Sequence, residues 1–461
     1  MKNIKTIIAV SVAAMVSSAT MAQNLNSAYF ADGHLYRHES NPAFGNENNY
    51  IAMPGIGNLN VNMGSNIGVD NIFYNVNGRT VTFLHPSVSA SEFLSGVNNK
   101  NRINESGKLQ ILGTGFKGMK GYNTIEINVR ENVGLIVPGS ILRLAKEGPQ
   151  NKTYDISDFN AHADAYTELA LGHSHQINDN LRIGAKFKML FGLANVDANF
   201  NKAQLTLNEN GYTGIVNAEV QSSIKGLKYE QKKKMRGADG HETEHEYVSD
   251  IDVDGFGLNG FGLAVDLGAE YKLDNNWKFS AALLDLGFIN YSNNMVASTR
   301  GNQTINTNDY IFNMDDEAEH SFENEGDRLG EGLANLYELH DMGDKGSRSK
   351  GLAATMNLGV QYTPDFYDKL SFGLLNSTRM AGKYSWTEFR VSANVAPSKI
   401  FTASANVAAG TYGASFGWLL DFHPKGFNLF LGMDHTLGKL AKQGIPLSGN
   451  GGVSLGMNFP F

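Results

Sequence analysis

Cysteine is absent from all 461 residues, which excludes a lipoprotein anchor and a disulfide framework. Proline is scarce, with 10 residues against 51 glycines. An excess of positive charge is lacking as well, because the formal net charge is −8 at pH 7 and the pI is about 5.9. A nucleic-acid partner is therefore not expected, since such partners select basic surfaces. No motif predicts a cofactor.

Long apolar runs are missing beyond the start of the chain. Residues 1–22 combine a positive region at Lys2 and Lys5 with a short apolar core and the small residues Thr20 and Ala22. This pattern is typical of a secretory signal peptide that is cleaved after about Ala22; the alternative is a buried N-terminal helix. No later stretch approaches the ~18 apolar residues of a membrane-spanning helix. We therefore expect an exported protein without a helical anchor.

Hydrophobic residues are spread thinly, with a mean hydropathy of −0.28, and they recur at every second position. From Leu181 to Leu193, apolar side chains alternate with small or charged ones, and the pattern returns from Phe261 to Leu273. Such alternation is typical of β-strands with one apolar and one polar face. In the first stretch we expect Phe187 to face lipid and Lys186 to face the lumen of a barrel, where Lys186→Gln would be nearly silent.

The alternating stretches are too long for an ordinary soluble sheet. They run for about 9 to 13 residues, whereas strands of soluble sheets usually have ~5–6 and strands tilted across a bilayer ~9–11. A closed barrel is the β structure that leaves no backbone group unpaired in lipid. We therefore predict an all-β fold, a transmembrane antiparallel β-barrel in lipid of the cell outer membrane. A soluble sandwich or adhesin is the alternative.

About fourteen strands are expected, and their connections support this count. Short and long connections alternate along the chain, as in outer-membrane barrels with short periplasmic turns and long extracellular loops. With a periplasmic N-terminus, every short turn falls on the periplasmic side. Residues 203–224 are interpreted as a hairpin that projects above the membrane. The predicted strands are 56–67, 108–117, 121–130, 165–177, 181–194, 258–273, 277–289, 352–362, 369–378, 386–395, 400–409, 414–422, 427–435 and 452–461.

A barrel of this size needs something that blocks its lumen. Eight strands enclose a space that side chains fill, whereas sixteen to eighteen leave a water channel. Residues 23–55 precede the predicted barrel, 56–461, and we predict that they form a luminal plug. Pro42 would hold its predecessor away from helix, and we expect the resulting turn to rest on inward charges such as Arg182 and Glu270. The turn consists of Asn41, Pro42, Ala43 and Phe44; an ordinary Asn-Pro turn is the alternative.

These residues carry a resemblance to known barrels. An Asn-Pro-Ala turn before the first strand of a barrel of this length is similar to the long-chain fatty-acid transporter family. The stretches SNPAFGNENNYIAMPGIGNL, YTELALGHSHQINDNLRIGAKFKMLFGLANV and LLDLGFINY look like an uncharacterised group of Gram-negative outer-membrane barrels. The resemblance implies a plugged, fourteen-stranded barrel. It also implies passage of a small hydrophobic ligand, by analogy.

The last residues, SLGMNFPF, resemble the signal by which the barrel-assembly machinery recognises outer-membrane barrels. A terminal strand with an exposed edge can be bound by β-augmentation. A chance terminal phenylalanine is the alternative. The signal residues are Ser454, Gly456, Phe459 and Phe461.

Two further sequence patterns are weak candidates, one for a metal site and one for a hydrolase active site. Asp250, Asp252 and Asp254 are spaced like the start of a calcium loop, but the twelfth position is Phe261, where a Glu is needed. We therefore predict no metal site. His173 to His175, in the sequence GHSH, raise the idea of a membrane-embedded hydrolase, but no spacing indicates a carboxylate partner. No catalytic residue is predicted, and the protein is not expected to be an enzyme.

Three functions remain open. The leading hypothesis is a plugged outer-membrane barrel that admits a small hydrophobic or amphipathic compound. The second is an interaction barrel of a secretion or cell-surface attachment system. The third, less favoured, is an outer-membrane hydrolase. An apolar tunnel would favour the first, and a solid plug beneath large ordered loops would favour the second.

Overall fold

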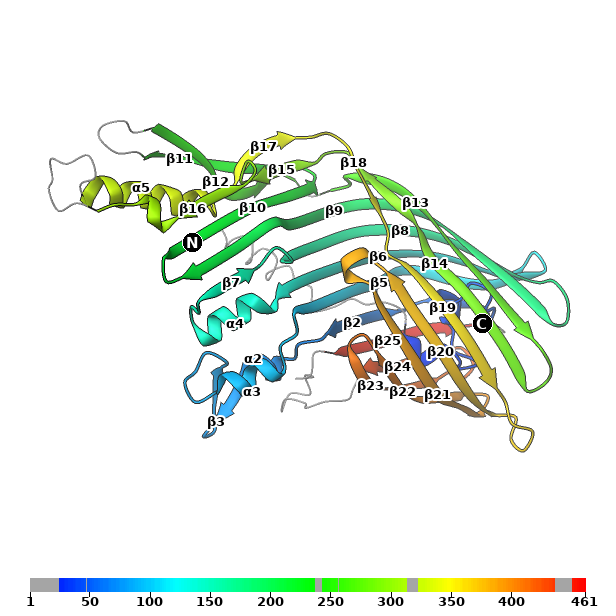
Figure 1. Ribbon diagram of the computed structural model, residues 1–461. Coiled ribbons are helices and arrows are strands. Elements are labelled where there is room, and N and C mark those ends of the chain that lie inside the picture. Colours follow the sequence, from blue (N-terminus) through cyan, green and yellow to red (C-terminus); the bar gives the residue numbers. More distant parts are fainter. Residues whose placement is uncertain (1–24, 47, 237–242, 256, 313–321, 436–449) are drawn as a thin grey trace.

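The computed structural model describes residues 25–46, 48–236, 243–255, 257–312, 322–435 and 450–461. Antiparallel strands form a closed fourteen-stranded barrel, because the last strand pairs with the first and the first pairs with the second (Figure 1). The predicted fold and strand count are confirmed. The wall consists of β1 (Tyr50–Ala52) with β2 (Leu59–Ser65), β5 (Lys100–Gly118), β6 (Gly121–Pro138), β8 (Asn160–Gln176), β9 (Leu181–Asn208), β13 (Gly260–Lys272), β14 (Trp277–Tyr291), β19 (Ala354–Tyr362), β20 (Leu370–Met380), β21 (Trp386–Ser398), β22 (Phe401–Gly410), β23 (Gly413–Phe422), β24 (Asn428–His435) and β25 (Gly451–Pro460).

The first wall strand is interrupted, which the sequence pattern did not indicate. Ala52 pairs with Asn458 and Leu59 pairs with Leu455, so residues 53–58 form an insertion between β1 and β2. The insertion still bonds to the neighbouring strand, because the Met457 N–H donates to the Ile56 carbonyl at 2.9 Å. The wall therefore remains continuous at the break.

The two ends of the barrel differ. At the short-turn end, strands are joined by brief connections such as residues 119–120 and 177–180. At the long-loop end, helices and additional strands gather beyond the ring (Figure 1). These elements are α2 (Val69–Ile72), β3 (Phe73–Val76), β4 (Arg79–Thr82), α3 (Ala90–Ser95), α4 (Gly139–Glu147), β7 (Lys152–Asp155), β10 (Gly211–Ile224), β11 (Leu227–Arg236), β12 (Thr243–Val253), β15 (Met295–Ser298), β16 (Gln303–Asn306), α5 (Phe322–Asn335), β17 (His340–Asp344) and β18 (Arg348–Gly351).

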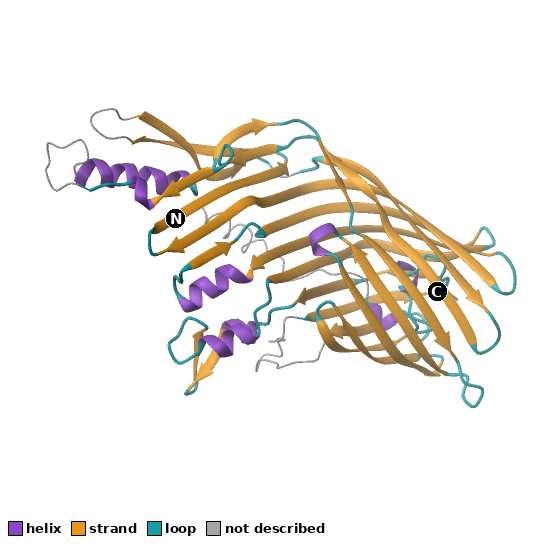
Figure 2. Cartoon of the chain, in the orientation of Figure 1, coloured by secondary structure: helices purple, strands orange, loops and turns teal. Residues whose placement is uncertain are grey.

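The hairpin expected at residues 203–224 is present, but its first arm is not a separate strand. β9 continues without a break for 28 residues, and its outer part pairs with β10 (Figure 2). β10 also pairs with β15 and β16, so a second sheet extends beyond the barrel. Its apolar side chains form a separate hydrophobic cluster around Ala198, Val220 and Tyr229. The long-loop end therefore has a core of its own.

The wall is apolar on its outer face and polar on its inner face, which is the reverse of the arrangement in a soluble protein. On β9, the outward Phe187 is 43% exposed, whereas the inward Lys186 and Lys188 are each 4% exposed. Other outward positions of the wall are also apolar and exposed, including Leu263 and Leu374. Apolar residues on the outside and polar residues inside are typical of a transmembrane barrel. Within the described part of the chain, no helix is both long and apolar enough to cross a membrane.

The lipid-facing assignment of β9 predicts a large effect of charge. Phe187→Arg should lower the free energy of unfolding by about 2–4 kcal/mol, because a cation would enter the hydrocarbon region. The measurement is urea unfolding of the protein folded into lipid vesicles. Phe187→Leu is the matched control, since it keeps an apolar side chain at the same position. Equal costs for Arg and Leu would contradict the assignment.

Candidate functional site

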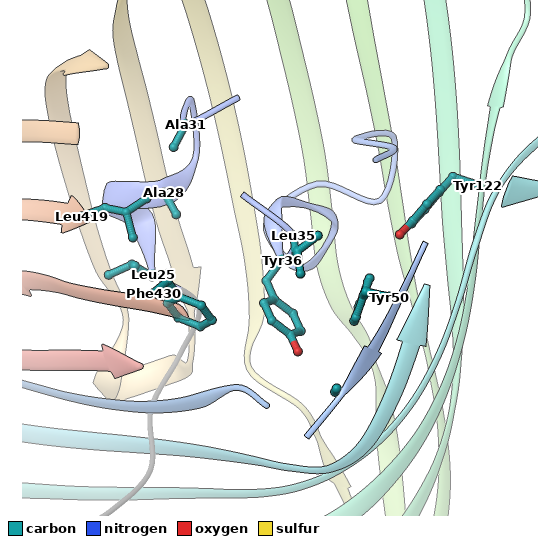
Figure 3. Close-up of a cluster of buried hydrophobic side chains, with 10 residues drawn as sticks. Leu25, Ala28, Ala31, Leu35, Tyr36, Tyr50, Tyr122, Leu419 and Phe430 are labelled. Atoms are coloured by element: carbon teal, nitrogen blue, oxygen red, sulfur yellow. The ribbon is translucent and has the colours of Figure 1, made fainter. Parts of the chain in front are cut away.

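Residues 25–46 with Asn48 and Asn49, which we name the N-terminal segment, lie inside the ring of strands. They include the short 3-10 helices η1 (Asn26–Ala28) and η2 (Arg37–Glu39). Figure 3 shows side chains of this segment packed between Leu419 and Phe430 on one side and Tyr122 on the other. The segment therefore spans the lumen between strands that lie far apart in the sequence.

Buried carboxylates of the wall hold the beginning of this segment. Asp434 accepts hydrogen bonds from the backbone N–H groups of Asn26 and Ser27, each at 2.7 Å. Asp421 lies 2.7 Å from Nδ1 of His34, and both side chains are buried. Charge-assisted bonds of this kind are stronger than neutral ones. They fix the segment against β23 and β24.

The middle of the segment is held from another side of the ring. Glu39 pairs with Lys108 of β5, and both are almost fully buried. The amide of Asn58 donates to both carboxylate oxygens of Glu39 at 3.0 Å. The hydroxyl of Tyr36 donates to Oδ1 of Asn458, in β25, at 2.6 Å. Burial of a charge is tolerated only when it is paired in this way.

The predicted turn at Asn41–Phe44 forms, and it rests mainly on a pair of glycines. The Phe44 N–H donates to the Asn41 carbonyl at 2.9 Å, which closes the turn. Gly184 of β9 and Gly268 of β13 are paired residues beneath it. A Cβ on Gly184 would lie 2.1 Å from the Pro42 carbonyl oxygen, and one on Gly268 would lie 2.0 Å from Oδ1 of Asn41. Only glycine permits this close approach.

Of the two charged residues expected to brace this turn, Arg182 lies beside it. A Cβ on Gly45, directly after the turn, would lie 2.1 Å from the Arg182 guanidinium. The same use of wall glycines recurs farther around the ring, at Gly373 beneath Phe30 and at Gly432 beneath Leu25. Two cavities between the segment and the wall measure about 10 Å³ each, the lower limit for one water molecule. The contact is therefore tightly packed.

A network of buried charges lies on the inner wall beside the segment. Nζ of Lys188 is 2.7 Å from Asp266 and 2.5 Å from Asp285, and Arg130 is 3.0 Å from the same Asp285. Asp285 occupies an irregular position of β14 with a φ of 58°, in the left-handed region that asparagine and aspartate tolerate better than most residues. Nζ of Lys186 is 2.8 Å from Glu126. Residues predicted to face the lumen, such as Lys186, therefore form buried ion pairs.

Beyond the N-terminal segment, the long-loop end of the ring encloses a cavity of about 490 Å³, which we name the polar vestibule. Its floor includes Asn26, and its rim includes Tyr384 and Tyr412. Eight asparagines and five tyrosine or tryptophan residues line it. Asparagine is abundant in the sequence, but no spacing indicates that so many side chains converge here.

A second cavity, of about 370 Å³, lies among the elements of the long-loop end, and we name it the apolar pocket. Most of its lining is apolar, with Ala203 and Phe200 from β9, Ala218 from β10 and Leu339 near α5. Tyr229 lines it as well, and burial raises the pKa of this hydroxyl. Asn199 lines both the apolar pocket and the polar vestibule, so the two cavities adjoin. No sequence pattern indicated this pocket, because its lining comes from elements that are far apart in the chain.

Three of the four residues of the predicted assembly signal lie on β25, and Phe461 directly follows this strand. Ser454 and Gly456 face the lumen, and the hydroxyl of Ser454 donates to Asn60. Phe459 and Phe461 are exposed on the outward face, at 44% and 71%. In the closed barrel both edges of β25 are paired. A role in recognition therefore applies to the strand before closure and stays a prediction.

The three aspartates considered as metal ligands do not form a metal site. Asp250 and Asp252 are exposed in β12, and Asp254 pairs with Lys228 at 3.2 Å. Within the described ranges, no group of three or more His, Cys, Asp or Glu side chains is arranged to hold a metal ion.

The histidines considered for a hydrolase do not pair with the serine between them. Ser174 is buried on the inward face of β8, whereas His173 and His175 lie on the outward face, because side chains alternate along a strand. Nδ1 of His173 is 2.9 Å from the amide oxygen of Asn123. This arrangement offers no nucleophile with an adjacent base at the GHSH sequence.

The chain matches a family model and has low overall similarity to solved structures. No curated protein matches the sequence. Solved structures that are similar to this chain include the toluene transporter TodX of P. putida (10% identity, 91% of each chain, TM-score 0.37), a Pseudomonas aeruginosa FadL homologue (11% identity, 96% of this chain and 98% of that chain, TM-score 0.39) and the translocator domain of the autotransporter NalP from Neisseria meningitidis (8% identity, 91% of this chain and 90% of that chain, TM-score 0.32). Similarities this low carry no argument about activity. A family model matches residues 42–434, and the chain belongs to this family, described as a family of unknown function (DUF5723).

Proposed function

We propose that this protein is an outer-membrane barrel that captures a small hydrophobic or amphipathic compound at the cell surface and passes it inward. The apolar pocket carries this proposal. It lies at the long-loop end, which is the extracellular end in barrels of this architecture. Enclosed apolar cavities of this size are the usual sites for small ligands. The adjoining polar vestibule can receive the polar end of an amphipathic compound.

Passage requires the N-terminal segment to act as a plug that moves. We propose that residues 23–49 form this plug and that the ligand reaches it through the vestibule. The predicted boundary at residue 55 is too late, because Tyr50–Ala52 pair with β5 and β25 within the wall. Support comes from the segment's position across the lumen, where non-covalent contacts such as the ion pair of Glu39 with Lys108 hold it to the wall. We also propose that the C-terminal strand, ending in Phe461, is recognised by the barrel-assembly machinery during insertion.

Capture is tested with a photoreactive diazirine derivative of decanol. We expect the protein in lipid nanodiscs to be labelled on residues 196–203 and 216–220, and excess decanol to prevent this labelling. Ala203→Phe should abolish it, because Ala203 is buried in the pocket wall and a larger side chain would fill the space. Ala185→Phe is the matched control, since Ala185 lies on the lipid-facing side of the same strand. Labelling of lipid-facing strands serves as an internal reference.

Passage is tested separately by uptake of radiolabelled decanol into cells that lack the protein and are complemented with each variant. Reduced uptake with Ala203→Phe and normal uptake with Ala185→Phe are expected. Labelling outside the pocket, unchanged by Ala203→Phe, would contradict capture.

A second candidate function is supported by a different observation. The lumen is filled, and the long-loop end is an ordered platform with its own hydrophobic cluster. A barrel that binds a secretion or attachment partner needs these features and no passage. Pocket labelling combined with unchanged uptake in Ala203→Phe cells would favour this role.

A further inference from the structure

The polar vestibule has a chemistry that capture of an apolar compound does not require. Eight asparagines line it, and three of them have a buried amide oxygen without a hydrogen-bond partner in the described part of the chain. Oδ1 of Asn195 is buried without a hydrogen-bond partner among the described residues, and the residue is 1% exposed. Oδ1 of Asn62 and Oδ1 of Asn104 are also buried and unpartnered in that part of the chain. Buried polar atoms normally have partners, so such acceptors point to a ligand that donates hydrogen bonds.

Aromatic side chains stand beside these amides. Tyr384, Trp386 and Tyr412 line the vestibule and are partly exposed. Asparagines hold two of them in place: the amide of Asn104 donates to the Tyr384 carbonyl at 3.1 Å and to the Tyr412 hydroxyl, and the Tyr384 hydroxyl donates to Asn160. Tyrosine and tryptophan offer a flat apolar face together with a polar group. Their positions are thus preorganised for a ligand with flat C–H faces.

The charges around the vestibule largely neutralise each other. Asp197 pairs with His162 at 2.8 Å, with Arg348, and with Lys350 at 2.7 Å. Glu388 pairs with Arg390 at 2.7 Å. Other charged residues of the lining, such as Glu105 and Lys383, are of opposite sign, so charge of one sign does not dominate. The lining therefore favours a neutral ligand.

We infer that the polar vestibule binds a neutral saccharide. A pyranose ring carries hydroxyl groups that donate to amide oxygens and accept from amide N–H groups, and its C–H faces stack on aromatic rings. The volume of about 490 Å³ falls within the range of small-molecule sites and suits a short oligosaccharide. This site is distinct from the apolar pocket, and it does not depend on capture or passage of an apolar compound.

The test uses the full protein in an amine-oxide detergent, because alkyl glycoside detergents would occupy the site. Binding of maltotriose, cellotriose and tri-N-acetylchitotriose is measured by calorimetry. The chain has three tryptophans, so a Trp277→Phe, Trp418→Phe background leaves Trp386 as a reporter. We expect at least one neutral trisaccharide to bind and to protect Trp386 from acrylamide quenching.

Three variants separate recognition of the saccharide from folding of the protein. Trp386→Leu should weaken binding about tenfold, the upper part of what aromatic contacts contribute. Trp418→Leu should leave it unchanged, because Trp418 lies on the outward face of β23. Asn195→Leu provides a second inward variant, and the heat-shifted gel band reports folding of each.

Two results would overturn the inference: no binding of any of the three neutral trisaccharides, or stronger binding of trigalacturonate than of all of them. Decanol labelling of the apolar pocket should be unaffected by Trp386→Leu. Failure of saccharide binding can therefore be distinguished from failure of the proposed capture.

Discussion

Removal of residues 26–46 is expected to turn a closed barrel into one that conducts ions steadily across a planar bilayer. These residues fill the lumen between opposite walls, and fourteen strands enclose more space than inward side chains alone fill. The lipid-facing surface belongs to the wall strands, so the shortened protein should still insert. β1 begins at Tyr50 and pairs with β5 and β25, so the deletion stops before it. The measurement is single-channel current, compared with that of the intact protein.

A point variant tests the same idea without shortening the chain. Gly184→Leu should displace the turn at Asn41–Phe44, because its Cβ would meet backbone atoms of Pro42, which cannot rotate away. We expect intermittent current from this variant. Gly351→Leu is the control, because a Cβ at Gly351 meets no atom within 4 Å. If the deleted protein folds and conducts no more than the intact one, the segment does not seal the lumen.

Lys188→Met is expected to lower the free energy of unfolding by about 3–5 kcal/mol. Lys188 is the shared partner of Asp266 and Asp285, and all three side chains are buried. Methionine fills a similar volume without charge, so the buried Asp266 would lose its cation and Asp285 would be left with Arg130. Guanidinium unfolding of the protein in vesicles measures the loss.

Two comparisons identify the cause. Adding Asp266→Asn to Lys188→Met should recover part of the loss, because it removes a buried charge and keeps an oxygen for the Asp285 N–H, which lies 2.7 Å away. Lys425→Met, at an exposed turn, should change the free energy of unfolding by less than about 0.5 kcal/mol. A loss for Lys188→Met as small as that of Lys425→Met would show that the network is not important for stability.

The ring of strands could be predicted from the sequence because its signal is local. Alternation within β9 or β13 depends on residues two positions apart, and the facing of Phe187 and Lys186 follows from it. The short connections, such as residues 177–180, could also be predicted from neighbouring residues alone. β1 was missed, because Tyr50–Ala52 is only three residues long and lies in the stretch that was predicted to form the plug, 23–55. The outer part of β9 was predicted to belong to a separate hairpin, because alternation is incomplete between residues 194 and 203.

The interior could not be predicted in the same way, because it depends on contacts between distant residues. Lys186→Gln was expected to be nearly silent, since a lumen-facing lysine is ordinarily solvated. The structure instead buries Lys186 against Glu126, so this substitution should destabilise the fold. Gly184 and Gly268 appear in the sequence as small inward residues, and nothing local indicates that they seat the turn at Asn41–Phe44. The lining of both cavities is likewise assembled from elements that are far apart in the chain.

The length of β9 has a consequence for the kinetics of ligand arrival. Nine residues separate Phe191, which pairs with the exposed Phe261 on the outward face, from Phe200 in the apolar pocket. At about 3.4 Å per residue, the pocket stands roughly 30 Å farther along the strand. A compound dissolved in the bilayer has no direct route to it. Arrival should therefore follow the free aqueous concentration of the ligand, and sparingly soluble compounds should bind slowly even when their affinity is high.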